Sequence, residues 1–537
     1  MFRMYAWKMK NLTRRDAIKL ASVGAVAAMR PASSGASGRS HDPVPVWEVF
    51  ELELKGISTG NPFTEVRLSA TFSLDHRSIE VDGFYDGAGV YKVRFMPDAV
   101  GVWSYRVSSS LAGLDGLEGG FEALPPLAGA HGPVRVQNTH HFAYADGAPF
   151  FPFGTTCYAW MHQSEALQQQ TLTALRNSPF NKLRMCVFPK SYEYNHNEPD
   201  FYPFERSASG VNDYTRFNPA FFRHIEQRIG DLRAAGIEAD LILFHPYDRW
   251  GFAAMPPEAD DRYLRYLLAR LSAYRNIWWS MANEYDLMHA KSTQDFDRFF
   301  HIIEEKDAYS HLRSIHYSVT MYDYAKPWVT HASLQSTDFA AAPGYLAAWK
   351  KPVCYDEVMY EGNLNRRWGN LSGDEMTRRF WLGVISGCYV THGETYLDPE
   401  QPFDESASPP LFWSQGGPLR GSSPRQIAFL RRLLEESVAT GNGNVRTGLV
   451  PAPSPYYLNA TAYEADGKQA NTILYYFDFH QPVWYEFPLP EGSFRAEWID
   501  PLAMTVTPQA GRFSGKAKLR LPGRPFQALR FRAVGGV

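Results

Sequence analysis

The pattern of apolar and polar positions changes twice along the chain. From about residue 44 to 127, and again over roughly the last hundred residues, short runs alternate apolar and polar positions and are separated by Gly, Pro and Asp. A period of two is typical of strands that bury one face. Both regions are therefore predicted to be antiparallel β-sandwiches.

Between these regions the periodicity is mixed. Amphipathic segments such as AFFRHIEQRIGDLRAAG and DRYLRYLLARLSAYR carry apolar residues at helical spacing. They lie between eight strand-like apolar runs, namely FFPFGTTCY, KLRMCVFP, ADLILFHP, NIWWSMANE, LRSIHYSV, WVTHASLQS, KPVCYDE and SGCYVTHGE. Eight such alternations predict a (β/α)₈ TIM barrel. Because the fifth and sixth runs are close in sequence, the helix between them is expected to be short or missing.

The chain is thus predicted to be multidomain, as its length of 537 residues also suggests. We expect a signal peptide and linker over 1–40, an N-terminal β-sandwich over 41–127, the barrel over 128–440 and a C-terminal β-sandwich over 441–537. The N-terminal sandwich is expected to buttress the barrel or frame a cleft, and carbohydrate binding is the alternative.

The N-terminus resembles an export signal. Basic residues precede a modest apolar run, Ala21 to Met29, which is too short to span a bilayer. Within the basic part, TRRDAIKL resembles the twin-arginine motif, and an ordinary basic leader is the alternative. A periplasmic or secreted location follows from either.

Composition excludes several classes of protein. The formal net charge of −3 gives no basic surface for nucleic acid and no cationic face for a membrane once a signal is removed. The aromatic content of 15% is compatible with sugar stacking and equally with aromatic β-cores. Four cysteines do not form a disulfide framework in so long a chain, and we expect them to be small apolar residues in the core of the barrel.

Polar or aromatic residues follow each predicted barrel strand, where barrel enzymes keep their sites. They are Tyr158, Arg184, His245, Glu284, Tyr317, His331, Glu357, and His392 with Glu394. A long polar and aromatic excursion, residues 192–218, follows the second strand and is predicted to form a wall of the substrate site.

Two of these residues suggest glycoside hydrolysis. Glu284 and Glu357 each end an apolar run, and three strand steps place them on opposite sides of the barrel mouth. A pair of carboxyl groups about 5 to 5.5 Å apart cleaves a glycosidic bond with retention of configuration. Glu361 in YEGN is the competing nucleophile, whereas Asp356 is expected to point the other way by strand alternation. Capping a strand or pairing with an arginine is the structural alternative for each glutamate.

Asn283-Glu284 and Glu357 on the fourth and seventh strands resemble the clan of (β/α)₈ retaining glycoside hydrolases that includes endoglucanase-type and apiosidase-like families. The resemblance implies that Glu284 is the acid/base, Glu357 the nucleophile and Asn283 a ligand of the sugar's 2-hydroxyl. Arg184 and His245 would orient the nucleophile and the sugar. We expect aromatic burial to keep Glu284 protonated, and hydrogen bonds from Arg184 or Tyr317 to keep Glu357 ionised.

The remaining candidates concern substrate and metal. His392 and Glu394 share one strand face, but without further ligands substrate hydrogen bonding is favoured over a metal, so no metal or cofactor is predicted. Trp160, Trp250 and Trp368 could be sugar platforms or could pack loops. The residues assigned to substrate binding are Asn283, Arg184, His245, Tyr317, His331, Tyr158, Trp160, Trp250, Glu361, His392 and Glu394.

The sequence therefore predicts a retaining glycoside hydrolase whose partner is a polysaccharide or oligosaccharide. A non-catalytic carbohydrate-binding or scaffold protein is the alternative. A polysaccharide lyase, which would use a Tyr, His or Lys base, ranks below both. No oligomeric state is predicted.

Overall fold

A computed structural model describes residues 39–397, 412–439, 449–452, 459–465 and 469–534. The predicted signal peptide and most of the linker lie outside these residues. Within the described segments, no helix is both long enough and apolar enough to cross a membrane.

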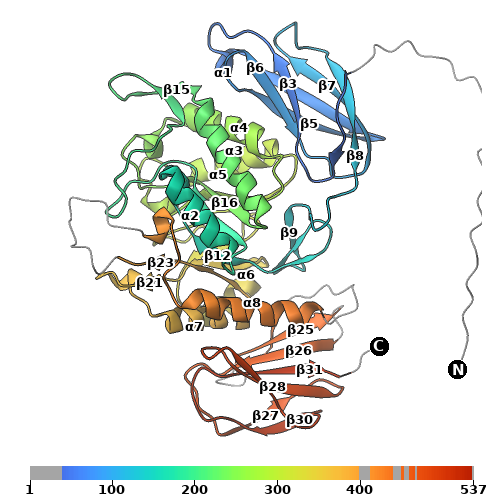
Figure 1. The fold of residues 1–537 in the computed structure, drawn as a ribbon, viewed down its shortest axis with the longest axis vertical. Coiled ribbons are helices and arrows are strands. Elements are labelled where there is room, and N and C mark those ends of the chain that lie inside the picture. Colours follow the sequence, from blue (N-terminus) through green and yellow to red (C-terminus); the bar gives the residue numbers. More distant parts are fainter. Residues whose placement is uncertain (1–38, 398–411, 440–448, 453–458, 466–468, 535–537) are drawn as a thin grey trace, which may run out of the picture. The chain divides into compact units, whose positions relative to one another are not determined.

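An eight-stranded parallel sheet forms the centre of the fold (Figure 1). The strands run in the order β18-β17-β16-β13-β12-β22-β20-β19, and a bridge between His316 and Ser333 joins its two ends. All eight predicted strands are present, as β12 (Phe153–Thr156), β13 (Lys182–Cys186), β16 (Glu238–Phe244), β17 (Ile277–Ala282), β18 (Leu312–Ser314), β19 (Ala332–Gln335), β20 (Val353–Glu357) and β22 (Tyr389–His392). This barrel-like sheet confirms the central prediction.

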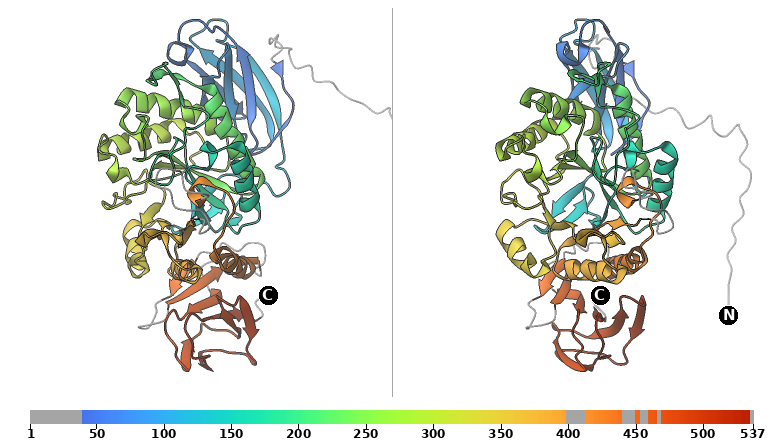
Figure 2. Two further views of the ribbon diagram at one scale, coloured as in Figure 1. Left: turned by 60° about the vertical axis from the view of Figure 1, so that its left-hand side comes forward. Right: turned by 90° about the vertical axis from the view of Figure 1, so that its left-hand side faces the viewer.

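Helices surround the barrel strands in all the views (Figure 2). They are α2 (Glu165–Arg176), α3 (Pro219–Ala234), α4 (Pro257–Leu271), α5 (Thr293–Lys306), α6 (Ala342–Trp349), α7 (Gly373–Ile385) and α8 (Ser423–Ala439). Residues 315–331, all of them described, hold no helix between β18 and β19, as expected. Sequence signals set the helix ends; α5, for example, begins with a capping box of Ser292 and Asp295.

Short elements decorate the loops. The excursion after β13 contains the hairpin β14 (Phe204–Arg206) and β15 (Asn212–Phe217), and β21 (Glu361–Gly362) pairs with β23 (Glu394–Thr395). Single 3₁₀ turns are η2 (Trp160–His162), η3 (Phe252–Ala254), η4 (Tyr285–Leu287), η5 (Phe339–Ala341), η6 (Arg367–Gly369) and η7 (Trp413–Gln415).

A small antiparallel sheet covers the barrel at the start of its strands. It comprises β9 (Val134–Gln137), β10 (His141–Tyr144) and β11 (Pro149–Phe150). Phe142 lies 5.0 Å from Trp278 and 5.7 Å from His331, ring centroid to ring centroid. His331 directly precedes β19, so its expected position at the carboxyl end is corrected. The polar residue at that end is Gln335.

The N-terminal flank is a β-domain. Its strands are β1 (Arg39–Ser40), β2 (Val44–Pro45), β3 (Phe50–Lys55), β4 (Leu68–Leu74), β5 (Arg77–Tyr85), β6 (Val90–Phe95), β7 (Gly101–Ser109) and β8 (Glu118–Leu124), with one helical turn, α1 (Pro62–Glu65). Alternate residues of β3 and β7 are buried, which follows from their period-two patterns. The domain has its own core, which includes Phe50, Phe72 and Phe121.

The C-terminal flank is also built of strands. They are β24 (Leu449–Ala452), β25 (Asn459–Ala465), β26 (Gln469–Tyr476), β27 (Trp484–Pro488), β28 (Phe494–Asp500), β29 (Thr505–Pro508), β30 (Lys516–Arg520) and β31 (Ala528–Ala533). Six of them form one sheet, and β27 pairs with β30 separately. Flanking β-domains are thus present, while the two-layer sandwich form of each stays a prediction.

Candidate active site

Glu284 lies just beyond the buried strand β17, at a backbone irregularity. Its φ of 48° and ψ of 54° are left-handed, a conformation that costs a non-glycine residue roughly 1 kcal/mol or more. The side chain is buried and accepts hydrogen bonds from the Tyr247 hydroxyl and from Asn283 Nδ2, the latter at 3.4 Å. With its amide nitrogen turned toward them, Gln335 donates to Glu284 Oε1 at 3.2 Å and to the Tyr317 carbonyl at 3.0 Å.

Glu357 ends β20 at a second irregularity. Leu334 pairs with Tyr355 but Gln335 pairs with Glu357, so Asp356 is an extra residue on its strand. This break in register changes the direction of Glu357 relative to plain alternation. The Glu357 carboxylate accepts a hydrogen bond from the Tyr158 hydroxyl, which lies 3.2 Å from the Tyr360 hydroxyl.

The pKa of Glu357 is raised to about 7 by burial and by the nearby Glu284 carboxylate. Arg184, the Tyr158 hydrogen bond and Lys190 act in the opposite direction. We expected Arg184 or Tyr317 to donate to Glu357; Tyr158 does so instead. We also expected an ionised Glu357, whereas the raised pKa means that Glu357 titrates near neutral pH.

A buried ionic network lies beneath the two glutamates. Lys182 Nζ is 2.6 Å from Asp356 Oδ1 and 3.1 Å from Asp240 Oδ2. Asp356 thus points into the barrel, away from the cleft. The cations of Lys182 and Arg184 hold the pKa of Asp356 well below its usual value. Arg184 is fully buried and donates to Asn283 Oδ1 at 3.2 Å. Arg184 therefore orients the amide whose other end bonds Glu284.

Lys190 is a buried cation beside the glutamates. Its Nζ lies 4.2 Å from the ring centroid of Tyr158, 4.5 Å from that of Tyr192 and 4.2 Å from that of Tyr247. Burial lowers its pKa, and both glutamates raise it. The three rings hold the ammonium by cation–π attraction in the wall of the cleft.

Both glutamates open onto one cleft of about 520 Å³. Its walls combine polar side chains with aromatic ones, and the aromatic Trp368 is exposed by 37%. Tyr192 and Tyr194 come from the excursion after the second strand, which was predicted to form a wall, and Tyr194 stacks on Phe412 at 5.4 Å. The other predicted site residues on the cleft are Asn283, Tyr158 and Glu394.

Several predicted substrate ligands do not line this cleft. Trp160 is fully buried, and Trp250 is held by Glu198 through its indole nitrogen at 2.8 Å, so both pack loops. His245 bonds the Phe188 carbonyl at 3.1 Å behind the wall. Tyr317 is buried and offers its backbone carbonyl to Gln335.

Glu361 and His392 also lie off the cleft. Glu361 accepts hydrogen bonds from Ser422 N at 2.7 Å and Ser423 N at 3.3 Å, at the start of α8. A carboxylate is stabilised at that helix end. His392 is fully buried against Thr155. Neither residue faces the space in which a sugar would meet Glu284.

Sequence reasoning missed several residues of the cleft. Lys190, Tyr247 and Gln335 were absent from the predicted site although each lies at or just after a predicted strand. Lys190 and Tyr247 follow a proline that ends the apolar run, and this position was the available signal. Tyr360 and Phe412 reach the cleft through loops whose paths no local pattern encodes.

Comparisons with known proteins identify the family of the barrel region. Residues 136–438, more than half of the chain, match the family described as apiosidase-like, catalytic domain. Residues 43–110 and 462–532 match two families of domains of unknown function (DUF5060 and DUF5605). No curated protein matches the chain.

Solved structures give the same assignment. A candidate glycoside hydrolase from Bacteroides vulgatus ATCC 8482 is 39% identical over 92% of this chain and 100% of that one, with a TM-score of 0.84. A family 5 glycoside hydrolase from the same organism, 15% identical over 75% of this chain and 94% of that one, has a TM-score of 0.57 and shows the fold alone. The chain is a glycoside hydrolase and belongs to the apiosidase-like family.

Proposed function

We propose that the protein is a retaining glycoside hydrolase that cleaves an oligosaccharide or polysaccharide by double displacement. The supporting observation is that two buried glutamates, one just beyond β17 and one at the end of β20, open onto one cleft that is lined in part by aromatic rings. A backbone irregularity directs each of them. Aromatic walls suit the C–H faces of sugar rings.

In the first step, Glu357 attacks the anomeric carbon while Glu284 protonates the departing glycosidic oxygen. The C–O bond to the leaving group breaks, and a glycosyl ester of Glu357 forms. In the second step, Glu284 takes a proton from water, which attacks the same carbon and releases Glu357. The family resemblance assigns Asn283 to the sugar's 2-hydroxyl, and the hydrogen bonds of its amide with Arg184 and Glu284 hold it beside the acid/base.

Double displacement needs a defined protonation state of the two glutamates. Glu357 titrates near pH 7 there, and catalysis needs it ionised with Glu284 protonated. A leaving-group oxygen beside Glu284 accepts a hydrogen bond from its protonated form. Substrate binding therefore favours the protonated form of Glu284 that the first step needs.

Small-anion rescue tests these roles. Aryl glycosides and furanosides, apiofuranosides first because of the family's name, identify a substrate whose good leaving group needs little acid. Glu284→Ala and Glu357→Gly are then assayed with azide. Azide in the space of Glu357 yields a glycosyl azide of inverted configuration, and azide in the space of Glu284 yields a retained one. The opposite pair of anomers would reverse the roles, and full activity in either variant without azide would refute the mechanism.

Three further proposals concern export, the flanking domains and the partner. TRRDAIKL supports export to the periplasm or beyond, without a membrane anchor afterwards. The separate apolar cores of the two flanks support a sandwich form for each. The formal net charge of −3 supports a carbohydrate partner rather than nucleic acid.

A further inference from the structure

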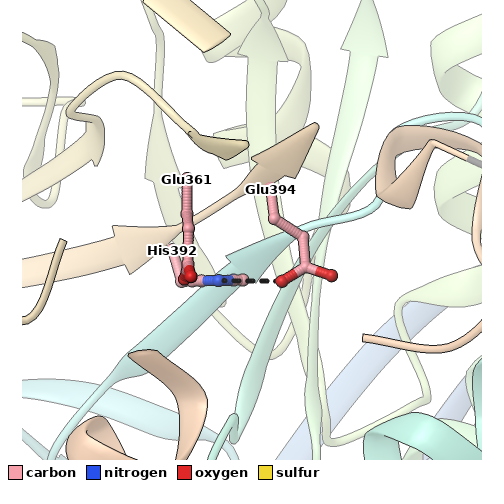
Figure 3. Close-up of side chains that lie close together, drawn as sticks. All are labelled: Glu361, His392 and Glu394. Atoms are coloured by element: carbon pink, nitrogen blue, oxygen red, sulfur yellow. Dashed lines mark ion pairs between the residues drawn. The ribbon is translucent and has the colours of Figure 1, made fainter. Parts of the chain in front are cut away.

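Glu361, His392 and Glu394 converge behind the cleft wall. One ligand atom from each lies within 4.8 Å of the others, and all three side chains are buried (Figure 3). His392 ends β22, and Glu361 of β21 pairs in register with Glu394 of β23. Glu361, which precedes His392 by 31 residues (392 − 361), therefore supplies the third ligand that the HGET segment itself does not contain.

The His392 ring has one satisfied and one unsatisfied nitrogen. Nδ1 lies 3.0 Å from Thr155 Oγ1, and the ring stacks on Phe180 at 4.6 Å, which fixes its orientation. Nε2 is buried without a hydrogen-bond partner and points at Glu394 Oε2, 3.8 Å away (Figure 3). That separation is too long for a hydrogen bond. A histidine held at one nitrogen with the other aimed at carboxylates has the arrangement of a metal ligand.

Neither carboxylate forms an ion pair with a Lys or Arg side chain in the described part of the chain, and the only charged-group contact within 4.0 Å is that of His392 with Glu394. In the loop before α8, the Arg420 and Gly421 N–H groups donate to Glu394. Ser422 N and the hydroxyls of Ser423 and Tyr396 donate to Glu361. Buried charges are normally paired or bound to metal.

The space between the ligands has the right size. If three atoms lie at mutual distances of 4.8 Å, a central ion is about 2.8 Å from each. Zinc–ligand bonds of about 2.0 to 2.2 Å then need each side chain to move inward by less than about 1 Å. Gly421 keeps its backbone close, because a Cβ there would lie 2.4 Å from Glu361 Oε2 and 2.6 Å from Glu394 Oε2.

We propose that Glu361, His392 and Glu394 bind one divalent transition-metal ion of the Zn²⁺ or Mn²⁺ class. One imidazole nitrogen and two carboxylates suit these ions better than Mg²⁺ or Ca²⁺, which prefer oxygen ligands alone. The ion ties the ends of β21, β22 and β23 to the first turn of α8. Because Glu394 also borders the cleft, the ion stiffens one wall of the active site without taking part in the chemistry.

Direct metal binding tests the proposal on the full chain. The protein is stripped with a chelator, titrated with Zn²⁺ or Mn²⁺ by calorimetry, and its thermal unfolding is followed in parallel. One equivalent of metal should bind, and the unfolding midpoint should rise with metal and fall with chelator. His392→Gln should weaken this binding about a hundredfold or more. His331→Gln, at the opposite end of the barrel, is the matched control and should retain it.

A second variant covers the case in which His392→Gln does not fold. Glu394→Gln keeps an oxygen acceptor for the N–H groups of Arg420 and Gly421 but removes the carboxylate ligand, and it should also lose the one equivalent of bound metal. The proposal is overturned if the stripped wild-type chain binds neither ion at one equivalent. It is also overturned if either variant binds metal as tightly as His331→Gln does.

Discussion

Replacing Lys190 by Met should move the acid limb of the pH profile upward. Below its pKa of about 7, Glu357 is protonated and cannot attack, so kcat/KM rises with pH through that value. The Lys190 ammonium lowers the pKa of Glu357, because a nearby cation favours the carboxylate. Removing the cation therefore raises this pKa, and higher pH is needed to ionise the nucleophile.

The size of the effect follows from the tyrosine between the two charges. Nζ lies 4.2 Å from the Tyr158 ring centroid, and the Tyr158 hydroxyl bonds Glu357, which places the charges roughly 7 Å apart. At an effective dielectric constant of about 20 the attraction is about 2.4 kcal/mol. This corresponds to about one to two pH units, and the acid limb is expected between about pH 8 and 9.

The assay measures kcat/KM from pH 4 to 10 on an aryl glycoside that the wild type hydrolyses. Lys190→Arg keeps the cation and is expected to keep the acid limb near pH 7, which separates charge from packing. The shape of the profile is compared rather than its height, since either variant can change substrate binding. An unchanged acid limb in Lys190→Met would refute the electrostatic role of Lys190.

Three other predictions concern stability and binding. Because burial and the Glu284 carboxylate raise the pKa of Glu357 from 4.5 to about 7, the fold loses stability as pH rises from about 4.5 to about 7, so Glu357→Gln should raise the free energy of unfolding by up to about 3 kcal/mol at pH 8 and little at pH 4 in urea titrations. Glu226→Gln should destabilise the protein by about 3 to 5 kcal/mol, since Glu226 pairs with the buried Arg94 and Arg270; a loss below about 1 kcal/mol would contradict this. Trp368→Ala should raise KM several-fold with little change in kcat if the exposed indole only binds sugar, and an equal loss in kcat would show a role in the transition state.

Much of the barrel could be predicted because its signals are local. Parallel strands buried on both faces give continuous apolar runs, and each of the eight runs contains a strand of the sheet. The carboxyl ends of such strands share one face, so Glu284 and Glu357 were expected on one cleft, and both line it. The absence of a helix before β19 could also be predicted, because few residues separate the fifth and sixth apolar runs.

What could not be predicted depends on contacts between distant segments. His331 was placed at the wrong end of its strand because WVTHASLQS is longer than the four-residue β19, and its apolar pattern does not mark where pairing starts. Glu361 joins His392 and Glu394 only through the register of β21 with β23. Lys190 acquires its role from three tyrosines on three separate loops or strands.

The two glutamates show why a site is harder to predict than the strands that carry it. Regular alternation puts Asp356 and Glu357 on opposite faces of β20, and the sequence contains nothing but that alternation. The extra residue in the β19–β20 register and the left-handed backbone of Glu284 are departures from regular geometry, held by surrounding packing. A repeating pattern specifies the scaffold, whereas the directions of the two carboxylates are specified where that pattern is broken.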